Sequence, residues 1–365
     1  MNVMRCHAAF FFLLVSAALG VQQPAAAPPS ALPPTTAAEA PNRDTSYIDA
    51  QGTAHVTRVV KVPVTISSAA QLALGHPMPD QVPPQSLAER RRTTDESTAR
   101  AGAAWSRLCP NQIVEDKIAG VPVRIVTPEG LPDSNRDKVL INLHGGGFNS
   151  DSGSLAESIP IASYTRMKVV AVLYRLAPEH PFPAAVDDAI AVYKELLKSY
   201  KPEHVVIYGT SAGAIITGEV AAKLKQLGLP MPAALGIFSA LGDFARPGDS
   251  ASLFSLRGLS GHLEPPGPEP HDPYYIGGAD PKDPVLSPIY GDLRGLPPTL
   301  FVTSTRDMLL SGTVNLHRAY LNAGVDARLV VFDALPHAFW YDAMLPESQE
   351  ASHIMADFFV RRLGN

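Results

Sequence analysis

Short, predominantly apolar runs recur along the chain after Ile113, without the alternation that is typical of half-buried strands. The runs are Val139 to Leu143, Lys168 to Tyr174, Val205 to Tyr208, Leu235 to Ser239, Leu300 to Ser304 and Arg328 to Phe332. Continuous apolar strands are typical of a parallel sheet whose two faces are both covered. Upstream, Ile113 to Ile118 and Val121 to Thr127 flank an Ala-Gly pair, which predicts an antiparallel hairpin.

Segments with helical spacing of apolar positions separate these runs. They are Ala184 to Ser199, Ala214 to Leu227 and Gly312 to Ala323, and Glu347 to Leu363 closes the chain. Strands that alternate with helices indicate a mainly parallel sheet joined by right-handed crossovers. The pattern therefore predicts an α/β architecture.

The amino-terminal 20 residues have the pattern of a secretory signal. Arg5 supplies positive charge, Ala8 to Leu19 is too short to span a bilayer, and small residues follow at a cleavage position. We expect export to the periplasm or medium, with no stable membrane anchor after cleavage; an uncleaved anchor is the alternative. Residues 21–45 are rich in proline and alanine and predict a disordered tether.

Residues 46–112 are assigned to an amino-terminal cap region, and residues 113–365 to the catalytic domain. Within the cap region, Ser86 to Trp105 reads as a polar helix and Val56 to Ile66 as a possible short strand. The stretch from Gly242 to Asp283 is too long for a simple loop and is rich in glycine and proline. We expect it to fold over the carboxyl edge of the sheet as a lid.

Composition narrows the class of protein. The chain is 45% hydrophobic and 18% charged, and its net charge of -5 argues against nucleic acid or an anionic membrane surface as a partner. The basic run Arg90 to Arg92 reads as a solvated helix face. Cys6 would leave with the signal, so Cys109 could form neither an internal disulfide nor a two-cysteine metal site.

A glycine-flanked serine follows one apolar run. The sequence Gly209-Thr210-Ser211-Ala212-Gly213 lies between a predicted strand and a predicted helix, where a serine hydroxyl stands above the carboxyl end of the sheet. A β-carbon at position 209 or 213 would collide with the neighbouring strand or helix. The alternative is an ordinary glycine-rich connection.

A second glycine loop follows the run that ends at Leu143. It reads His144-Gly145-Gly146-Gly147-Phe148, and bare glycine backbone lets N–H groups approach a ligand closely. A developing oxyanion requires such donors. We predict the amides of Gly146, Gly147 and Ala212 as the donors, with His144 and Gly145 supporting the loop; a flexible turn is the alternative.

Two late apolar runs lead to a candidate acid and a candidate base. In this architecture the acid should follow one late strand and the histidine the next, on the same edge as the serine. This order predicts Ser211 as nucleophile, His337 as general base and Asp307 as the carboxylate that orients it. Asp333 and Asp342 are competing acids. No histidine pair has the spacing of a metal site, so none is expected.

The motifs HGGGF, YRLAPEHPFPAAVDD, GTSAG, TRDMLL and PHAFW occur in that order. In combination they resemble the hormone-sensitive-lipase-like family of α/β-hydrolase carboxylesterases, over roughly Ile113 to Leu363. The resemblance implies an eight-stranded α/β-hydrolase sheet, a cap, a catalytic triad of the three residues named above and no cofactor. It also implies a small-molecule ester substrate with a short to medium acyl chain, and it is compatible with a homodimer.

Many members carry aspartate at the position of Thr210 and glycine at the position of Ala214, and the threonine form found here resembles the GTSAG branch of the family. That branch includes lactone and acetyl-ester hydrolases, and an amidase would use the same machinery. A non-catalytic small-molecule receptor is the alternative from another class, although no triad member is missing. Phe148 and Trp340 flank the expected site and are predicted as pocket walls, with plain core residues as the alternative.

Overall fold

The computed structural model of the protein describes residues 45–76, 86–260, 263 and 273–364. The predicted signal at residues 1–20 and the predicted tether at 21–45, apart from its last residue, lie outside the described residues. The chain divides into two compact units, Met1–Lys61 and Val62–Asn365.

The described part of the first unit is a small antiparallel ribbon of β1 (Tyr47–Ile48) and β2 (Ala54–His55). Asp49 shapes the connecting turn, because its carboxylate accepts two backbone N–H groups at 2.9 Å. The possible strand predicted at Val56 to Ile66 is wrong: that segment pairs with no strand. Its valines have strand propensity, but propensity without a paired neighbour does not form a ladder.

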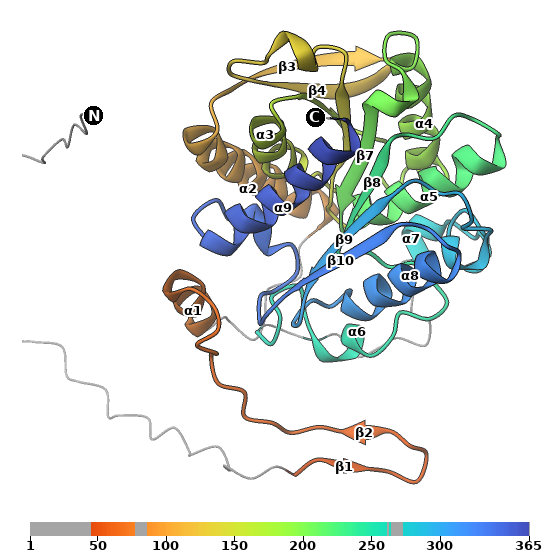
Figure 1. The fold of residues 1–365 in the computed structure, drawn as a ribbon. Coiled ribbons are helices and arrows are strands. Elements are labelled where there is room, and N and C mark those ends of the chain that lie inside the picture. The colour runs from red at the N-terminus through yellow and green to blue at the C-terminus, as the bar shows by residue number, and fades with distance from the viewer. Residues whose placement is uncertain (1–44, 77–85, 261–262, 264–272, 365) are drawn as a thin grey trace, which may run out of the picture. The chain divides into compact units, whose positions relative to one another are not determined.

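In the part of the chain that the structure describes, the second unit is built on an eight-stranded sheet (Figure 1). The strands run in the order β10-β9-β8-β7-β5-β6-β4-β3 across the sheet. They are β3 (Asn111–Ile118), β4 (Val121–Pro128), β5 (Val139–Leu143), β6 (Lys168–Val172), β7 (Val205–Thr210), β8 (Ala234–Phe238), β9 (Thr299–Ser304) and β10 (Ala327–Phe332). All neighbours from β6 to β10 are parallel, whereas β4 and β3 are antiparallel. The predicted mainly parallel sheet with an antiparallel hairpin is confirmed.

Helices cover both faces of this sheet (Figure 1). One face carries α2 (Leu87–Leu108), α3 (Ser154–Thr165) and α9 (Pro346–Arg362), and the other carries α4 (Ala184–Leu196), α5 (Ala212–Gln226) and α8 (Leu310–Asn322). The shorter elements are α1 (Ser68–Gly75), α6 (Ser250–Leu253), α7 (Pro273–Ile276), η1 (Asp133–Asn135), η2 (Pro202–His204), η3 (Pro288–Tyr290) and η4 (Phe339–Tyr341). No helix among the described residues is long and apolar enough to cross a bilayer.

The central strands are apolar throughout because their side chains belong to two cores, one on each face of the sheet. In β5, Val139 and Ile141 join the core under α4, α5 and α8, whereas Leu140 joins the core under α2, α3 and α9. In β7, Ile207 joins the first of these cores and Val206 joins the second. Since successive strand residues face opposite sides, a strand covered on both faces must be apolar throughout.

Most predicted helices are confirmed within a few residues, but α3 is absent from the sequence-based prediction. It contains Pro160, and most of its residues are buried, so it lacks the polar stripe that marks a surface helix. The predicted polar helix is confirmed as α2, which begins with a capping box. The Ser86 hydroxyl accepts from the Glu89 N–H, and the Glu89 carboxylate accepts from the Ser86 N–H.

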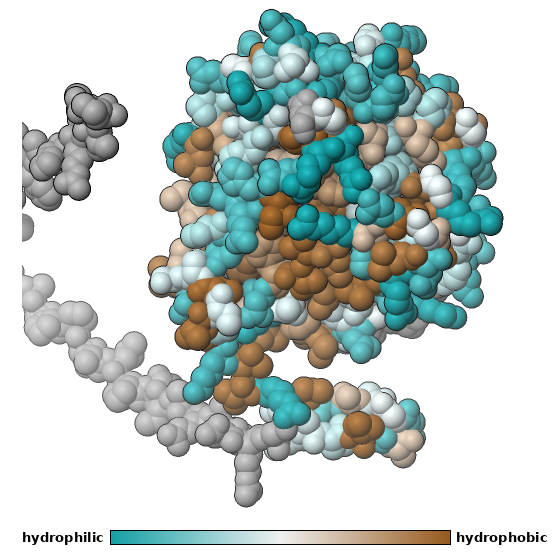
Figure 2. Space-filling view, viewed as in Figure 1, coloured by the Kyte–Doolittle hydropathy of each residue, from teal (hydrophilic) through white to brown (hydrophobic). Residues whose placement is uncertain are grey.

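The edge strand β10 leaves part of one face apolar. Figure 2 shows apolar side chains gathered over the region of β9 and β10, where Val331 is exposed. By contrast, charged and polar side chains dominate around the β3–β4 hairpin in the same view. The stretch predicted as a lid contributes α6 and α7 in its described part.

Candidate active site

Ser211 occupies a strained corner between β7 and α5. Its φ is +58° and its ψ is -123°, a conformation that is costly for a residue with a β-carbon. The flanking glycines make the corner possible, as the sequence predicts. A β-carbon would lie 2.3 Å from the Leu143 carbonyl oxygen at Gly209, and 1.8 Å from it at Gly213. The nucleophile candidate therefore stands at a sterically defined turn above the sheet.

The candidate base and acid are hydrogen-bonded to each other. His337 Nδ1 lies 2.8 Å from Asp307 Oδ1, and both side chains are buried. The Asp307 carboxylate also accepts from the hydroxyls of Ser239 and Thr303 and from the Leu309 N–H. Burial alone would raise the pKa of Asp307, but the His337 imidazole and these hydrogen bonds outweigh burial and lower it. The acid is therefore ionised at neutral pH.

The two competing acids are engaged elsewhere. Asp333 accepts from the hydroxyls of Thr65 and Thr305. Asp342 accepts from the Met344 N–H at 2.9 Å. Among the three candidates, only Asp307 bonds the imidazole within the described residues.

The glycine loop after β5 turns sharply at its second and third glycines. Gly146 has a φ of +127° and Gly147 a φ of +58°. A β-carbon at Gly146 would lie 2.0 Å from the Ser150 carbonyl oxygen. Among the described residues, no acceptor is present for the N–H groups of Gly146 and Gly147. The N–H of Ala212 lies in the first turn of α5, where no preceding helical carbonyl can accept it.

His144 lies beneath this loop as a buried support. Its Nδ1 is 2.9 Å from the Gly145 carbonyl oxygen, and its ring stacks on Tyr174 at 4.2 Å between centroids. The Tyr174 hydroxyl in turn donates to the His144 carbonyl at 2.6 Å. This placement agrees with a loop-shaping residue.

One cavity of about 660 Å³ brings the predicted residues together. Ser211, His337 and the three predicted amide positions all line it. Its remaining walls are largely apolar, and they include Phe148, Ile215, Leu241, Phe244, Leu256, Met308 and Leu309. Phe244 and Leu256 come from the stretch predicted as a lid. The candidate nucleophile, the candidate base and the candidate backbone donors therefore line one cavity.

Comparisons with known proteins agree with this geometry. A family model described as alpha/beta hydrolase fold matches residues 140–341. An acetyl-hydrolase of Streptomyces hygroscopicus is 33% identical over 252 residues, which cover 67% of this chain and 83% of that protein. The crystal structure of an esterase from the bacterial hormone-sensitive lipase family aligns with a TM-score of 0.66 and 32% identity, over 76% of this chain and 96% of that one. The crystal structure of esterase E25 aligns with a TM-score of 0.73 and 31% identity, over 84% and 97%.

The chain belongs to the hormone-sensitive-lipase family of α/β-hydrolases. The predicted family, fold and hydrolase class are thus confirmed. Within the described residues, no group of three or more His, Cys, Asp or Glu side chains could hold a metal ion. Cys109 is buried and free of any disulfide.

One pocket residue of the hydrolase was predicted wrongly. Phe148 lines the cavity, but Trp340 packs in the core beneath the elbow and is not among the lining residues. The Trp340 indole N–H donates to the Thr210 hydroxyl at 3.1 Å. A buried indole needs such an acceptor, and the threonine of the GTSAG motif provides it.

The basic run of the hydrolase is only partly solvated. Arg92 is exposed and pairs with Glu96 one turn away. Arg91 instead crosses to the loops behind the glycine motif: its guanidinium forms two 2.7 Å bonds to the Glu179 carboxylate and donates to the carbonyl of Asn149. This paired guanidinium holds the pKa of Glu179 at about 2. The interpretation of the whole run as a solvated face is therefore wrong for Arg91.

Glu157 is a site residue that sequence reasoning missed. It is 3% exposed, lies in α3, and accepts hydrogen bonds from the Gly145 N–H, the Asn142 amide and the Tyr341 hydroxyl. Burial raises the pKa of its carboxyl to about 7. No sequence signal distinguished this glutamate from an exposed one, because α3 itself was not predicted.

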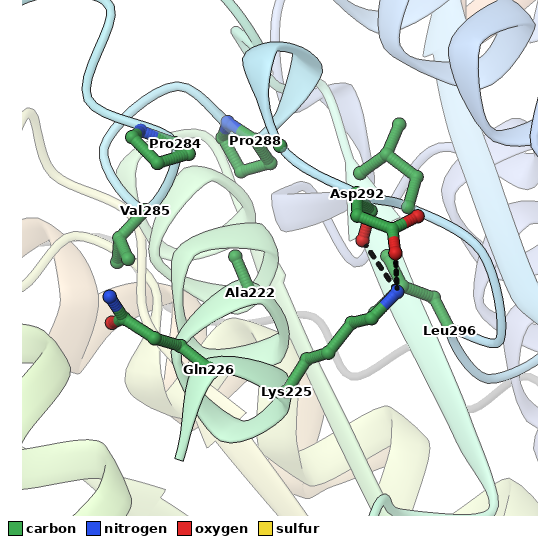
Figure 3. A pocket seen from close by; sticks show the side chains of 10 residues that line it. Ala222, Lys225, Gln226, Pro284, Val285, Pro288, Asp292 and Leu296 are labelled. Carbon is green, nitrogen blue, oxygen red and sulfur yellow. Dashed lines mark hydrogen bonds and ion pairs between the residues drawn. The ribbon is translucent and has the colours of Figure 1, made fainter. Parts of the chain in front are cut away.

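A separate hollow of about 270 Å³ lies between α5 and the segment 284–296 (Figure 3). Lys225 Nζ reaches the Asp292 carboxylate at 3.0 Å and the Asp292 carbonyl at 2.8 Å, so its charge is paired there. The other side chains that line the hollow are mostly apolar, and none of the predicted site residues lines it. The predicted site residues therefore line the larger cavity and not this hollow.

Proposed function

We propose that the hydrolase is a serine carboxylesterase that cleaves short- to medium-chain acyl esters through an acyl-enzyme intermediate. The observation that carries this proposal is the shared cavity. Ser211, His337 and the glycine-loop positions line it, and Asp307 is hydrogen-bonded to His337. The names of the similar proteins, an acetyl-hydrolase and esterases, support the ester class.

In the first half of the proposed reaction, Ser211 Oγ attacks the ester carbonyl carbon while His337 Nε2 takes the hydroxyl proton. The carbonyl oxygen gains charge and accepts hydrogen bonds from the amides of Gly146, Gly147 and Ala212. Asp307 holds the imidazole tautomer and stabilises the imidazolium. The ester C–O bond then breaks as His337 returns the proton to the leaving alcohol.

The second half uses water in place of the serine hydroxyl. His337 takes a proton from water, whose oxygen attacks the acyl carbon. The bond from that carbon to Ser211 Oγ breaks, and His337 returns the proton to Ser211. A carboxylic acid leaves and the free enzyme is restored.

The largely apolar walls support an acyl chain. Lining side chains such as Phe148, Phe244 and Leu256 offer hydrophobic contact, and Arg90 and Arg257 also line the cavity. The volume of about 660 Å³ lies within the range typical of small-molecule sites. Acetyl esters are the short end of this substrate class, and the similarity to the Streptomyces hygroscopicus acetyl-hydrolase favours them.

A panel of p-nitrophenyl esters, from acetate to palmitate, tests the proposal. We expect the wild type to show highest kcat/KM with short chains, and Ser211→Ala to lose ~10⁴-fold or more in kcat. Ser97→Ala, at an exposed position on α2, is the matched serine control and should keep wild-type rates. Comparable kcat values for wild type and Ser211→Ala would remove Ser211 from the mechanism.

A further inference from the structure

Glu157 sits where the two loops of the active site meet. We propose that Glu157 is a positioning residue that ties the glycine loop, which carries the oxyanion donors, to the loop that carries His337. The inference rests on the proposed function and deepens it. It assigns a role to a buried carboxyl that the triad does not use.

A single carboxylate oxygen makes the bridge. Glu157 Oε1 accepts from the Gly145 N–H at 3.0 Å and from the Tyr341 hydroxyl at 2.5 Å. Gly145 opens the glycine loop, and Tyr341 closes the short η4 turn that follows His337. Tyr341 also lines the active-site cavity. A shift of Glu157 would therefore move both loops relative to each other.

Two glycines leave room for this bridge because they have no β-carbon. A β-carbon at Gly153 would lie 2.0 Å from Glu157 Oε1 and 2.4 Å from the Tyr341 hydroxyl. A β-carbon at Gly145 would lie 2.6 Å from the same hydroxyl. Neither glycine has a positive φ, so close approach, rather than backbone conformation, explains why glycine is needed there.

Burying this carboxyl is costly, and the tyrosines and the aspartate around it carry no positive charge. The titratable groups that face it are Tyr341, Tyr208, Tyr174 and Asp151, and none of them supplies positive charge. Its hydrogen-bond partners in the described residues are neutral donors. An apolar residue of similar size would avoid the desolvation cost, so stability alone does not explain the glutamate.

A neighbouring amide allows the bridge to exist with or without charge on Glu157. Asn142 Nδ2 donates to Glu157 Oε2 at 2.7 Å, while Asn142 Oδ1 is buried without a partner among the described residues. With the Asn142 amide turned by 180°, its Oδ1 would accept a hydrogen bond from the protonated Oε2 of neutral Glu157. In both states Oε1 keeps its bonds to Gly145 and Tyr341.

Two tyrosines that touch Glu157 provide a matched test. The Tyr341 hydroxyl bonds the Glu157 side chain, whereas the Tyr208 hydroxyl donates to the Glu157 backbone carbonyl at 3.2 Å. We expect Tyr341→Phe to lower kcat roughly tenfold with KM within about threefold, because misplaced groups cost turnover more than binding. Tyr208→Phe loses a hydroxyl of similar burial and should keep kcat within about twofold.

The glutamate is tested with two substitutions. Glu157→Leu should lower kcat by roughly 10- to 100-fold, whereas Glu157→Gln, which can still accept from Gly145 and Tyr341, should recover most of the loss. In a double-mutant cycle, Glu157→Leu with Tyr341→Phe should be little worse than Glu157→Leu alone. Circular dichroism and thermal melts establish that each variant is folded.

Two results would overturn the inference. One is wild-type kcat in folded Glu157→Leu; the other is strict additivity of the two substitutions in the cycle. If Glu157→Leu does not fold, the two tyrosine variants decide the question. Equal kcat values for Tyr341→Phe and Tyr208→Phe would then overturn the inference. A failure of the proposed function would be seen in a different result, because it would leave Ser211→Ala active.

Discussion

Asp307 is 1% exposed, and one oxygen of its ionised carboxylate lies 2.8 Å from His337 Nδ1. Asparagine has nearly the same shape, but its NH₂ group donates hydrogen bonds and cannot accept one from the N–H of His337 Nδ1. We predict that Asp307→Asn lowers kcat by ~10⁴-fold with little change in circular dichroism, because the imidazole adopts the wrong tautomer. Steady-state kinetics on p-nitrophenyl acetate measures this.

Asp333→Asn is the matched control for this prediction. Asp333 follows the adjacent strand, β10, and accepts hydrogen bonds from the hydroxyls of Thr65 and Thr305. Its substitution should leave kcat within about threefold of the wild type. A larger loss in Asp333→Asn than in Asp307→Asn would reassign the acid.

Glu157 gives a prediction on stability. Its pKa is raised to about 7 from an ordinary 4.5, so the unfolded chain ionises this group at lower pH than the folded chain. The contribution of Glu157 to stability is therefore fully present below pH ~4.5, falls as pH rises, and levels off above pH ~7. Over this window it amounts to roughly 3 kcal/mol.

The comparison of wild type with Glu157→Gln isolates that contribution. Urea unfolding between pH 5 and 8 should show the stability of the wild type falling relative to Glu157→Gln as pH rises. A difference that stays constant over this range would mean that Glu157 has the same pKa in both states.

At the scale of elements, α2 connects the amino-terminal region of the second unit to the active-site loops. Arg91 donates to the carbonyls of Asn149 and Ala177 and forms a two-bond pair with Glu179. Asn149 follows the glycine loop directly after Phe148. The helix therefore supports the loop from outside the cavity.

We predict that Arg91→Ala lowers the free energy of unfolding by about 1–2 kcal/mol, since buried carbonyls lose charged donors. Arg92→Ala is the neighbouring control. Arg92 is exposed and pairs only within α2, so the loss should stay below about 0.5 kcal/mol. Chemical denaturation of both variants checks this, and equal losses would show that the cross-helix contacts of Arg91 add nothing.

For the molecule as a whole, local signals predicted most of the fold. The apolar runs determined the strands because both faces of the sheet are covered, and the glycines at 209 and 213 marked a turn that no β-carbon tolerates. The order of motifs then led to Ser211, Asp307 and His337. Each of these signals lies within a few consecutive residues.

What the sequence could not predict depends on contacts between distant residues. Tyr341 lies 184 residues after Glu157, and Glu179 lies 88 residues after Arg91. A glutamate and an arginine in such positions look like ordinary surface residues until the fold brings their partners close. Helix α3 was missed for a related reason, because burial on nearly all sides removes the amphipathic pattern.

The central claim is that one serine, activated by one histidine, faces the cavity. Reaction with diethyl p-nitrophenyl phosphate followed by peptide mass mapping tests it most directly, since an activated serine is phosphorylated. The account predicts one modified site, Ser211, and a reaction at least ~100-fold slower in His337→Ala. Modification at another residue, or an unchanged rate in His337→Ala, would contradict it.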